Sequence, residues 1–449
     1  MRVSILTKNA CWGDAVGAQV AAKVAFFLDC GADIRVFAED GRFLHPVVEP
    51  FCRTLDADNP GGDGWRFLRS SDLVIVEFTQ HYSLLQLVPI LARQKLRLII
   101  DYHGITPPEL WNLPHADALR QGIDELGLLW CADAVLTHSR FTRQEVLDKT
   151  GLPEKRVFTL GYPVDLSFWS GPDGEQSLRS RLGLESARIL LFVGRLAPNK
   201  RVPLLVEALA AFRDEYPPVH AVIVGNQGDA YAQEAERCRQ LAEKLGVSDR
   251  LHLLGKLGGH RLREAYRSAD VFVMPSLHEG FCLPVIEAMA AGLPVVAARS
   301  TALPGTVGNA GLTFTPDDVD DLVRQLRRIW ETDLVSPSQK KQPDKKPLRL
   351  AVVSARFGTH FVGGAETSLR LIANTLANAG HRVEVFTTSN CAATDRRKPI
   401  TRCQFDSRRH HHSPVSDRRG TNAPNGPAAS NNHRSRRHRT TRSGRTILK

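Results

Sequence analysis

The sequence lacks a long apolar run, a secretory leader and closely spaced cysteine pairs. No stretch of the 449 residues reaches the roughly 20 continuous apolar residues that a membrane-spanning helix needs. The opening, MRVSILTKNA, enters a strand-like segment without the apolar core and cleavage site of a signal peptide. The eight cysteines show no Cys-x-x-Cys spacing. We therefore expect free thiols in the cytoplasm, or at the cytoplasmic face of the membrane, rather than disulfides or a zinc site.

Basic charge is confined to the end of the chain. The net charge is +11, but residues 396–449 hold fifteen Lys or Arg and two Asp, which leaves about −2 for residues 1–395. The same segment contains five Ile, Leu, Val or Phe residues, too few to bury a core. We predict a disordered Arg-rich tail at 396–449 and no specific nucleic-acid partner, because an Arg-rich tail binds polyanions without selectivity.

Short β-branched runs alternate with longer amphipathic stretches up to about residue 330. The expected helices include 15–28, 204–215, 230–245 and 317–330. Strands that are apolar throughout, each followed by a helix, indicate parallel sheets covered on both faces. We therefore expect an α/β protein with two Rossmann-like, doubly wound domains, 1–170 and 171–335, that face a cleft. The expected strands are 3–6, 33–37, 73–77, 96–101, 134–137 and 157–159, then 189–193, 221–224, 251–254, 271–274, 294–297 and 312–314.

The sequence changes character after the second domain. Residues 336–348 form a Pro- and Lys-rich linker with no apolar period. The segment 349–395 then opens like the amino terminus, since RLAVVSARFG and the following helix-like stretch repeat the pattern of RVSILTKNA, with two residues inserted. This is an internal repeat of the start of one α/β module.

The most specific motif is SLHEGFCLPVIEAMAAGLPVVA at 276–297. A helix is expected to start near Leu283, so the backbone N–H groups of Phe281, Cys282 and Leu283 form an anion site suited to a diphosphate. Glu279 in the loop and Glu287 on the helix can each accept hydrogen bonds from hydroxyl groups, one from a sugar and the other from a ribose. Taken alone, such a pair of Glu residues is more often simply exposed.

The whole segment resembles the donor site of family 4 (group 1) retaining glycosyltransferases with the GT-B fold. FVGRLAPNKR at 192–201 is similar to that family's first loop of the second domain. The resemblance implies that Arg195 and Lys200 bind the donor diphosphate. It also implies that Glu279 holds the sugar and that Glu287 holds the ribose.

Two segments of the first domain extend the expected site. DYHG at 101–104 ends a strand, and the resemblance implies that His103 contacts the donor sugar or phosphate. Asp101, two positions earlier, is expected on the same strand face, where it would orient His103. WGDAVGAQV places Gly13 and Gly17 before a helix, where the backbone can approach a phosphate closely.

The resemblance implies a metal-independent, hexosyltransferase-like enzyme of polysaccharide or glycoconjugate biosynthesis. Its donor would be a UDP- or GDP-linked sugar, and its acceptor a saccharide, lipid-linked or other hydroxyl, with peripheral membrane contact left open. The resemblance also implies that no cofactor is needed, since the departing phosphate would take the acceptor's proton. Asp56 and Asp58 match a metal-binding triplet, but they lie in a Pro/Gly-rich loop where Asp commonly forms turns.

Two departures from the family pattern keep other functions open. The family commonly has Gly where Cys282 stands, and it continues beyond 317–330 with helices that return to the first domain, where this chain enters its linker. The alternatives are a catalytically impaired nucleotide-sugar-binding remnant, and a sugar-nucleotide epimerase on the same architecture.

The loss of periodicity after residue 395 favours a shifted reading frame over a selected basic tail. The coding DNA distinguishes the two origins. A shifted frame predicts that one of the other two frames beyond codon 395 encodes α/β periodicity and a second Glu-x7-Glu segment. If neither frame does so, the tail is a genuine part of the protein.

Overall fold

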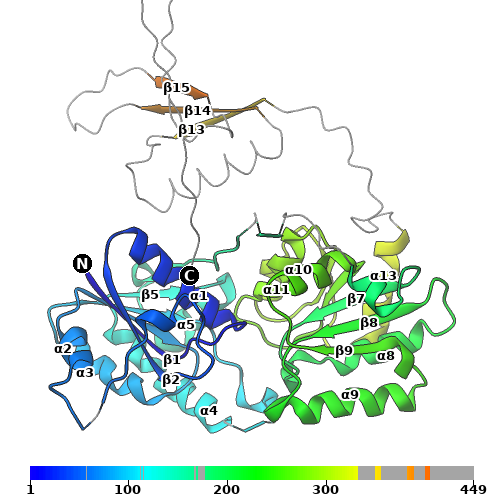
Figure 1. The fold of residues 1–449 in the computed structure, drawn as a ribbon, viewed down its shortest axis with the longest axis horizontal. Coiled ribbons are helices and arrows are strands. Elements are labelled where there is room, and N and C mark those ends of the chain that lie inside the picture. Colours follow the sequence, from blue (N-terminus) through cyan, green and yellow to red (C-terminus); the bar gives the residue numbers. More distant parts are fainter. Residues whose placement is uncertain are drawn as a thin grey trace, which may run out of the picture. The chain divides into compact units, whose positions relative to one another are not determined.

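The computed structural model describes residues 1–331 except 57, 112, 115, 166, 167 and 170–176, together with 349–354, 382–388 and 400–404. The chain divides into two compact units, Met1–Lys341 and Gln342–Lys449. The first unit holds two six-stranded sheets, each flanked by helices (Figure 1). Within the described residues, no helix is both long and apolar enough to cross a membrane.

The first domain is a parallel sheet in the order β2-β1-β3-β4-β5-β6. The chain adds β2 on one side of β1 and β3 on the other, so the strand order reverses between β1 and β3. In such folds ligands bind at the carboxyl ends of the strands beside this reversal. The strands are β1 Arg2–Asn9, β2 Asp33–Asp40, β3 Leu73–Phe78, β4 Arg97–Tyr102, β5 Ala134–Thr137 and β6 Val157–Thr159, and the helices α1 Ala15–Asp29, α2 Asp63–Arg69, α3 Val88–Leu91, α4 Ala116–Asp124 and α5 Arg140–Thr150.

The second domain repeats this plan in the order β12-β11-β10-β7-β8-β9, again parallel. Its reversal lies between β7 and β10. The strands are β7 Arg188–Val193, β8 Val219–Val224, β9 Leu251–Gly255, β10 Val271–Met274, β11 Val295–Ala298 and β12 Leu312–Phe314, and the helices α7 Leu178–Leu182, α8 Pro203–Ala211, α9 Ala232–Lys244, α10 Gly259–Ser268, α11 Leu283–Ala290, α12 Leu303–Val307 and α13 Val319–Glu331.

The packing of β1 shows why the strands read as unbroken apolar runs. Val3 and Ile5 pack with Val20 of α1 in one buried cluster. Leu6 points to the other face of the sheet and joins Val76 in a separate cluster. Because successive side chains point to opposite faces, a strand covered on both sides needs apolar residues at consecutive positions. The structure confirms each of the twelve predicted strands and the two-domain α/β fold.

The second unit contains three described strands. β13 Arg349–Ser354 pairs in parallel with β14 Arg382–Thr388, starting at Arg349 opposite Arg382. β1 and β2 start in the same way, at Arg2 opposite Asp33. The two pairs therefore match, with the two-residue insertion seen in the sequence repeat.

One strand departs from the sequence prediction. β15 Ile400–Gln404 pairs antiparallel with β14, inside the segment 396–449 that was expected to be disordered. Ile400 and Thr401 favour extended backbone, and the open edge of β14 offers unpaired backbone groups. The rest of that segment, the linker 336–348 and the expected helix of the repeat lie outside the described residues.

Removal of residues 336–449 is expected to leave the first unit folded, because both sheets and their helices lie within Met1–Lys341. The truncated protein should unfold cooperatively at the same midpoint as the full chain, within about 2 °C. Circular dichroism melting of both proteins measures this. A broad or strongly lowered transition would show that the second unit supplies packing that the two domains need.

Candidate functional site

The loop between β10 and α11 carries a strained turn at the expected anion site. The helix starts at Leu283, as predicted, and Cys282 precedes it with φ +77°, a left-handed conformation. L-residues other than glycine rarely adopt this conformation, so the cap stores strain of about 1–3 kcal/mol. The Cys282 side chain is buried and does not cap the helix. The backbone at the start of α11 is thus left without a side-chain cap, as an anion site requires.

Lys200 and Glu279 come together from two separate motifs. Lys200 ends the short helical turn Pro198–Lys200, and its Nζ lies 2.5 Å from Glu279 Oε1. The Glu279 backbone is fixed as well, since its N–H donates to Thr301 Oγ1 at 2.9 Å. Glu279 is 8% exposed. The structure therefore pairs the predicted phosphate-binding lysine with the predicted sugar-binding carboxylate.

Arg195 has different neighbours. It is exposed, and its guanidinium donates to the Tyr231 hydroxyl at 3.3 Å. The same guanidinium lies 5.7 Å from the ring centroid of Trp111, a residue of the first domain. The two predicted diphosphate ligands therefore have separate partners, and Arg195 links the two domains.

Glu287 lies on α11 and is coupled to α10. Its Oε2 accepts a hydrogen bond from the Tyr266 hydroxyl at 2.8 Å. Burial raises the pKa of Glu287 to about 7, and the Tyr266 hydrogen bond only partly offsets this. The side chain can therefore change its charge near neutral pH.

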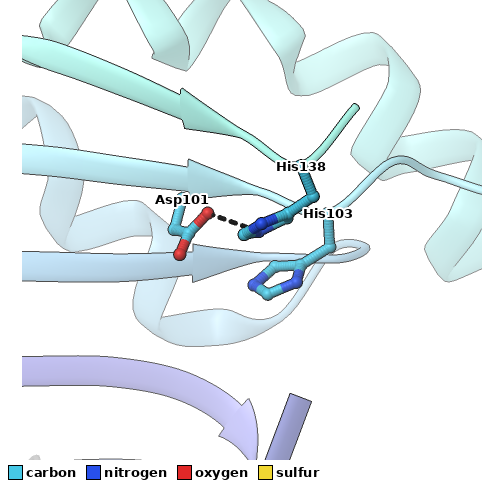
Figure 2. Close-up of side chains that lie close together, drawn as sticks. All are labelled: Asp101, His103 and His138. Carbon is cyan, nitrogen blue, oxygen red and sulfur yellow. Dashed lines mark ion pairs between the residues drawn. The ribbon is translucent and has the colours of Figure 1, made fainter. Parts of the chain in front are cut away.

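In the first domain, His103 lies just beyond β4 and is almost fully buried. Its Nε2 lies 2.7 Å from Glu77 Oε2, and its Nδ1 lies 2.5 Å from the Tyr162 hydroxyl. Asp101 instead pairs with His138, at 2.7 Å between Oδ1 and Nε2 (Figure 2). The prediction that Asp101 orients His103 is wrong. Alternation of side chains holds within a strand, and His103 lies past the last residue of β4.

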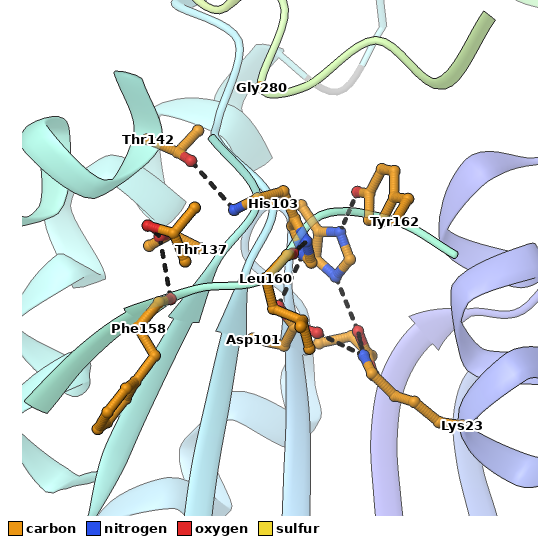
Figure 3. A network of polar contacts seen from close by, with 12 residues as sticks. Lys23, Asp101, His103, Thr137, Thr142, Phe158, Leu160, Tyr162 and Gly280 are labelled. Carbon is orange, nitrogen blue, oxygen red and sulfur yellow. Dashed lines mark hydrogen bonds and ion pairs between the residues drawn. The ribbon is translucent and has the colours of Figure 1, made fainter. Parts of the chain in front are cut away.

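A single lysine joins the two carboxylates of this cluster. Lys23 of α1 places its Nζ 2.5 Å from Glu77 Oε1 and 2.5 Å from Asp101 Oδ2 (Figure 3). Both carboxylates have side chains with 0% exposure. Burial lowers the pKa of Lys23, but Glu77 and Asp101 outweigh this, so that the net pKa is raised. Burial likewise raises the pKa of Asp101, and Lys23 together with the two histidines lowers it well below its ordinary range.

Asp101, His103 and His138 have the composition of a metal-binding group, since one ligand atom from each lies within 4.8 Å of the others (Figure 2). However, the Lys23 ammonium contacts the Asp101 carboxylate directly. A metal ion bound here would lie beside this positive charge in a buried site. The arrangement fits a lysine-compensated hydrogen-bond network better than a metal centre.

The two predicted glycines differ in role. Gly13 precedes α1 with φ +73°, and a Cβ there would lie 2.5 Å from Lys256 of the second domain. Gly17 lies inside α1, where a Cβ would lie 2.0 Å from the Cys11 carbonyl oxygen. The prediction that Gly17 precedes the helix is wrong, because Asp14 caps α1 and the helix starts at Ala15. Gly17 serves the packing of α1 on its own loop.

The two domains meet at the His103 cluster. A Cβ on Gly280 would lie 2.0 Å from the His103 carbonyl oxygen, and Ser139 Oγ donates to the Gly280 carbonyl at 2.7 Å. The Tyr162 and Phe281 rings pack edge to face, with 5.1 Å between centroids. The first-domain cluster thus lies directly against the start of α11.

Three residues of this cluster, Lys23, Glu77 and Tyr162, were missed from the sequence. Lys23 is the one lysine within the apolar stretch of α1, and Glu77 is an acidic residue at the end of an apolar strand. Isolated charges of this kind are signals, because a buried charge needs a partner. Tyr162 follows β6 in an irregular segment and carries no comparable signal.

Comparisons with known proteins place the second domain in a family. Residues 175–345 match the family model of the group 1 glycosyl transferases. We call the second domain, which carries this match, the group 1 domain. The matched residues include Arg195, Lys200, Glu279 and Glu287.

The chain is similar to curated enzymes and to solved structures. The chain is 31% identical over 261 residues to a D-inositol 3-phosphate glycosyltransferase of Streptomyces bingchenggensis, covering 56% of this chain and 57% of the relative. It is 35% identical over 208 residues to a D-inositol 3-phosphate glycosyltransferase of Geodermatophilus obscurus, and this alignment covers 44% of this chain and 45% of the relative. The chain thus spans about half the length of the curated relatives it matches.

The solved structures support the GT-B fold. HepE of Anabaena, in complex with UDP and glucose, aligns with a TM-score of 0.61 at 20% identity, covering 74% of this chain and 90% of HepE. Sucrose-phosphate synthase of Thermosynechococcus elongatus aligns with a TM-score of 0.55 at 20% identity, with the same shares covered.

The raised pKa of Glu287 predicts that the group 1 domain loses stability as the pH rises. The folded protein holds this proton up to about pH 7, whereas the ordinary pKa is 4.5. The folded state therefore binds more protons between these values, and its stability falls by about 3 kcal/mol, at about 1.4 kcal/mol per pKa unit. Glu287→Gln lacks this term, so its stability relative to wild type should increase from pH 5 to pH 8.

Urea unfolding of both proteins at the two pH values measures the difference. Glu185→Gln, at an exposed position, serves as the control and should keep the wild-type pH dependence. Equal pH dependence of wild type and Glu287→Gln would contradict the assignment.

Proposed function

We propose that this protein is a retaining, metal-independent glycosyltransferase that moves a hexose from a UDP- or GDP-linked donor to an acceptor hydroxyl. The contact of Lys200 with Glu279 beside the start of α11 carries the proposal. The group 1 match and the GT-B fold support it, as does the presence of UDP and glucose in the HepE structure. The free thiols of the described cysteines agree with a reducing compartment such as the cytoplasm.

The donor diphosphate binds at the start of α11. Backbone N–H groups of residues 281–283 point along the helix axis toward this end, where the helix dipole favours an anion. Lys200 adds a full positive charge. Its ammonium has three N–H donors, so it can keep Glu279 and still donate to a phosphate oxygen.

The two carboxylates divide the rest of the donor between them. Glu279 Oε1 accepts from Lys200, and a carboxylate offers further lone pairs to sugar hydroxyls. Glu287, one turn into α11, accepts from the ribose hydroxyls. Arg195, which lies against Trp111 of the first domain, binds the donor diphosphate together with Lys200.

We propose that transfer occurs with retention of configuration at the anomeric carbon. The acceptor hydroxyl attacks the anomeric carbon on the face from which the diphosphate leaves, and the departing phosphate oxygen takes its proton. The protein then contributes position and charge stabilisation instead of a covalent group. A saccharide, a lipid-linked group or another hydroxyl compound serves as acceptor.

Glu279→Ala and Glu287→Ala test the division of roles. Glu279→Ala should lower donor turnover roughly 10-fold or more while UDP or GDP affinity stays within about twofold, because sugar contacts strengthen as charge develops. Glu287→Ala should weaken nucleoside diphosphate binding about 10-fold, since a hydrogen bond to a charged group contributes about 1.5–3 kcal/mol.

Titration calorimetry and release of UDP or GDP from their glucose and mannose conjugates measure both effects. Glu185→Ala is the surface control. If both variants bound and reacted like wild type, the donor-site assignment would be wrong. Binding without turnover in the wild-type protein would identify an impaired remnant.

A further inference from the structure

Both ring nitrogens of His103 are already engaged by protein groups. Nε2 faces Glu77 Oε2 at 2.7 Å, and Nδ1 faces the Tyr162 hydroxyl at 2.5 Å. The His103 side chain is only 4% exposed. Each imidazole nitrogen takes part in one hydrogen bond, so His103 has no nitrogen left for a substrate in this arrangement.

The partners of His103 fix the direction of these hydrogen bonds. A carboxylate can only accept, so Nε2 carries the hydrogen that points to Glu77. In the neutral imidazole Nδ1 is then an acceptor, and the Tyr162 hydroxyl donates to it. Burial, followed by Asp101 and Glu77, raises the pKa of Tyr162 well above its ordinary value, so the side chain stays a phenol. The three residues form a carboxylate–imidazole–hydroxyl chain, the order that orients a hydroxyl in many active sites.

Tyr162 lies between His103 and the start of α11. It follows β6 in the segment that connects the two domains, and it is half-buried. Its ring packs 5.1 Å from Phe281 and 4.3 Å from His138. Figure 3 shows its hydroxyl directed at His103. With its hydrogen donated to His103, the phenol oxygen keeps its lone pairs for a second partner.

We propose that Tyr162 is a polar group of the first domain that contacts the donor sugar. Its phenol oxygen accepts a hydrogen bond from a sugar hydroxyl, while Glu77 and His103 act as positioning residues. The assignment rests on the proposed function, because the sugar belongs to a donor whose diphosphate binds at α11. It places one sugar contact on each domain, Tyr162 on the first and Glu279 on the second.

His138 and Lys23 hold the hydrogen-bonded residues Glu77, His103 and Tyr162 in place. His138 pairs with Asp101 at 2.7 Å and packs against both His103 and Tyr162. Lys23 compensates Glu77 and Asp101 together. Because all of these groups are buried, the hydroxyl of Tyr162 has a fixed position before the donor arrives, which lowers the entropy cost of binding.

The Tyr162→Phe variant separates this assignment from its main rival, in which Tyr162 merely fills the place of a sugar hydroxyl and leaves when the donor binds. If Tyr162 contacts the sugar, removal of the hydroxyl lowers turnover of UDP-glucose or GDP-mannose by roughly 10-fold or more, while UDP or GDP affinity stays within about twofold. If Tyr162 only blocks His103, the variant frees Nδ1 and donor affinity or turnover rises. A rise, or no change, overturns the proposal.

The positioning role of Glu77 has its own readout. The ¹⁵N spectrum of labelled histidine, assigned with His103→Asn, should show the His103 hydrogen on Nε2 in wild type and a shifted or mixed state in Glu77→Gln. Donor turnover should fall in Glu77→Gln while its thermal unfolding remains cooperative. If the wild-type spectrum showed the His103 hydrogen on Nδ1 alone, the proposed order of hydrogen bonds from Tyr162 through His103 to Glu77 would be wrong.

The matched control is Glu125→Gln, which removes the charge from another carboxylate–histidine pair of the first domain. Glu125 contacts His81 Nδ1 at 2.8 Å, outside the site. This variant should alter the His81 signal and leave turnover unchanged. If wild type turns over donor normally and Tyr162→Phe does too, only the present inference fails. If wild type binds no donor, the proposed function fails. The histidine spectrum then still reports whether Glu77, His103 and Tyr162 are hydrogen-bonded in the proposed order.

Discussion

Two carboxylates with no solvent exposure, Glu77 and Asp101, lie at the carboxyl ends of β3 and β4, and the Lys23 ammonium contacts both. Removal of one partner from a buried ion pair typically costs about 3–5 kcal/mol, because the other charge stays uncompensated. Here one lysine serves two carboxylates, and each carboxylate holds a histidine. The contacts therefore tie α1, β3 and β4 together at the strand ends where a ligand is expected, and the orientation of both imidazoles depends on them.

The second domain provides its part of the site by different means. Its proposed anion site is made of backbone, at a helix start that follows a buried cysteine in a left-handed conformation. Lys200 holds a full positive charge close to the predicted sugar carboxylate. The two halves are complementary. The first domain places the Tyr162 phenol against Phe281, beside the buried imidazole and carboxylate groups, and the second domain holds N–H groups and a lysine of the kind that bind phosphate.

The fold and the helix start at Leu283 could be predicted because both follow from local sequence. Strands buried on both faces give continuous apolar runs, and the loop and helix of 276–297 form one contiguous motif. The buried cluster of the first domain could not be predicted in the same way. Lys23 finds its partners 54 and 78 residues away, so its role depends on the strand order.

The wrong predictions have physical causes as well. The expected link between Asp101 and His103 assumed that strand alternation continues, but the strand ends at Tyr102. Gly17 was expected before α1, but the helix start at Ala15, which the sequence also predicted, places Gly17 inside the helix. The strand at Ile400–Gln404 forms on the edge of β14, in a segment whose composition lacks the apolar residues of a core. In each case a contact that is distant in sequence, or a helix or strand boundary, decided the outcome.

The central claim is that the start of α11, with Lys200, binds the diphosphate of a nucleotide-sugar. Titration calorimetry of the full chain with UDP, GDP, UDP-glucose and GDP-mannose tests it most directly, with Lys200→Ala as the comparison. The account predicts that one nucleoside diphosphate and its sugar conjugate bind selectively. It also predicts that Lys200→Ala weakens this binding by roughly 10-fold or more. Absence of binding by all four compounds, or equal affinity in wild type and Lys200→Ala, would contradict it.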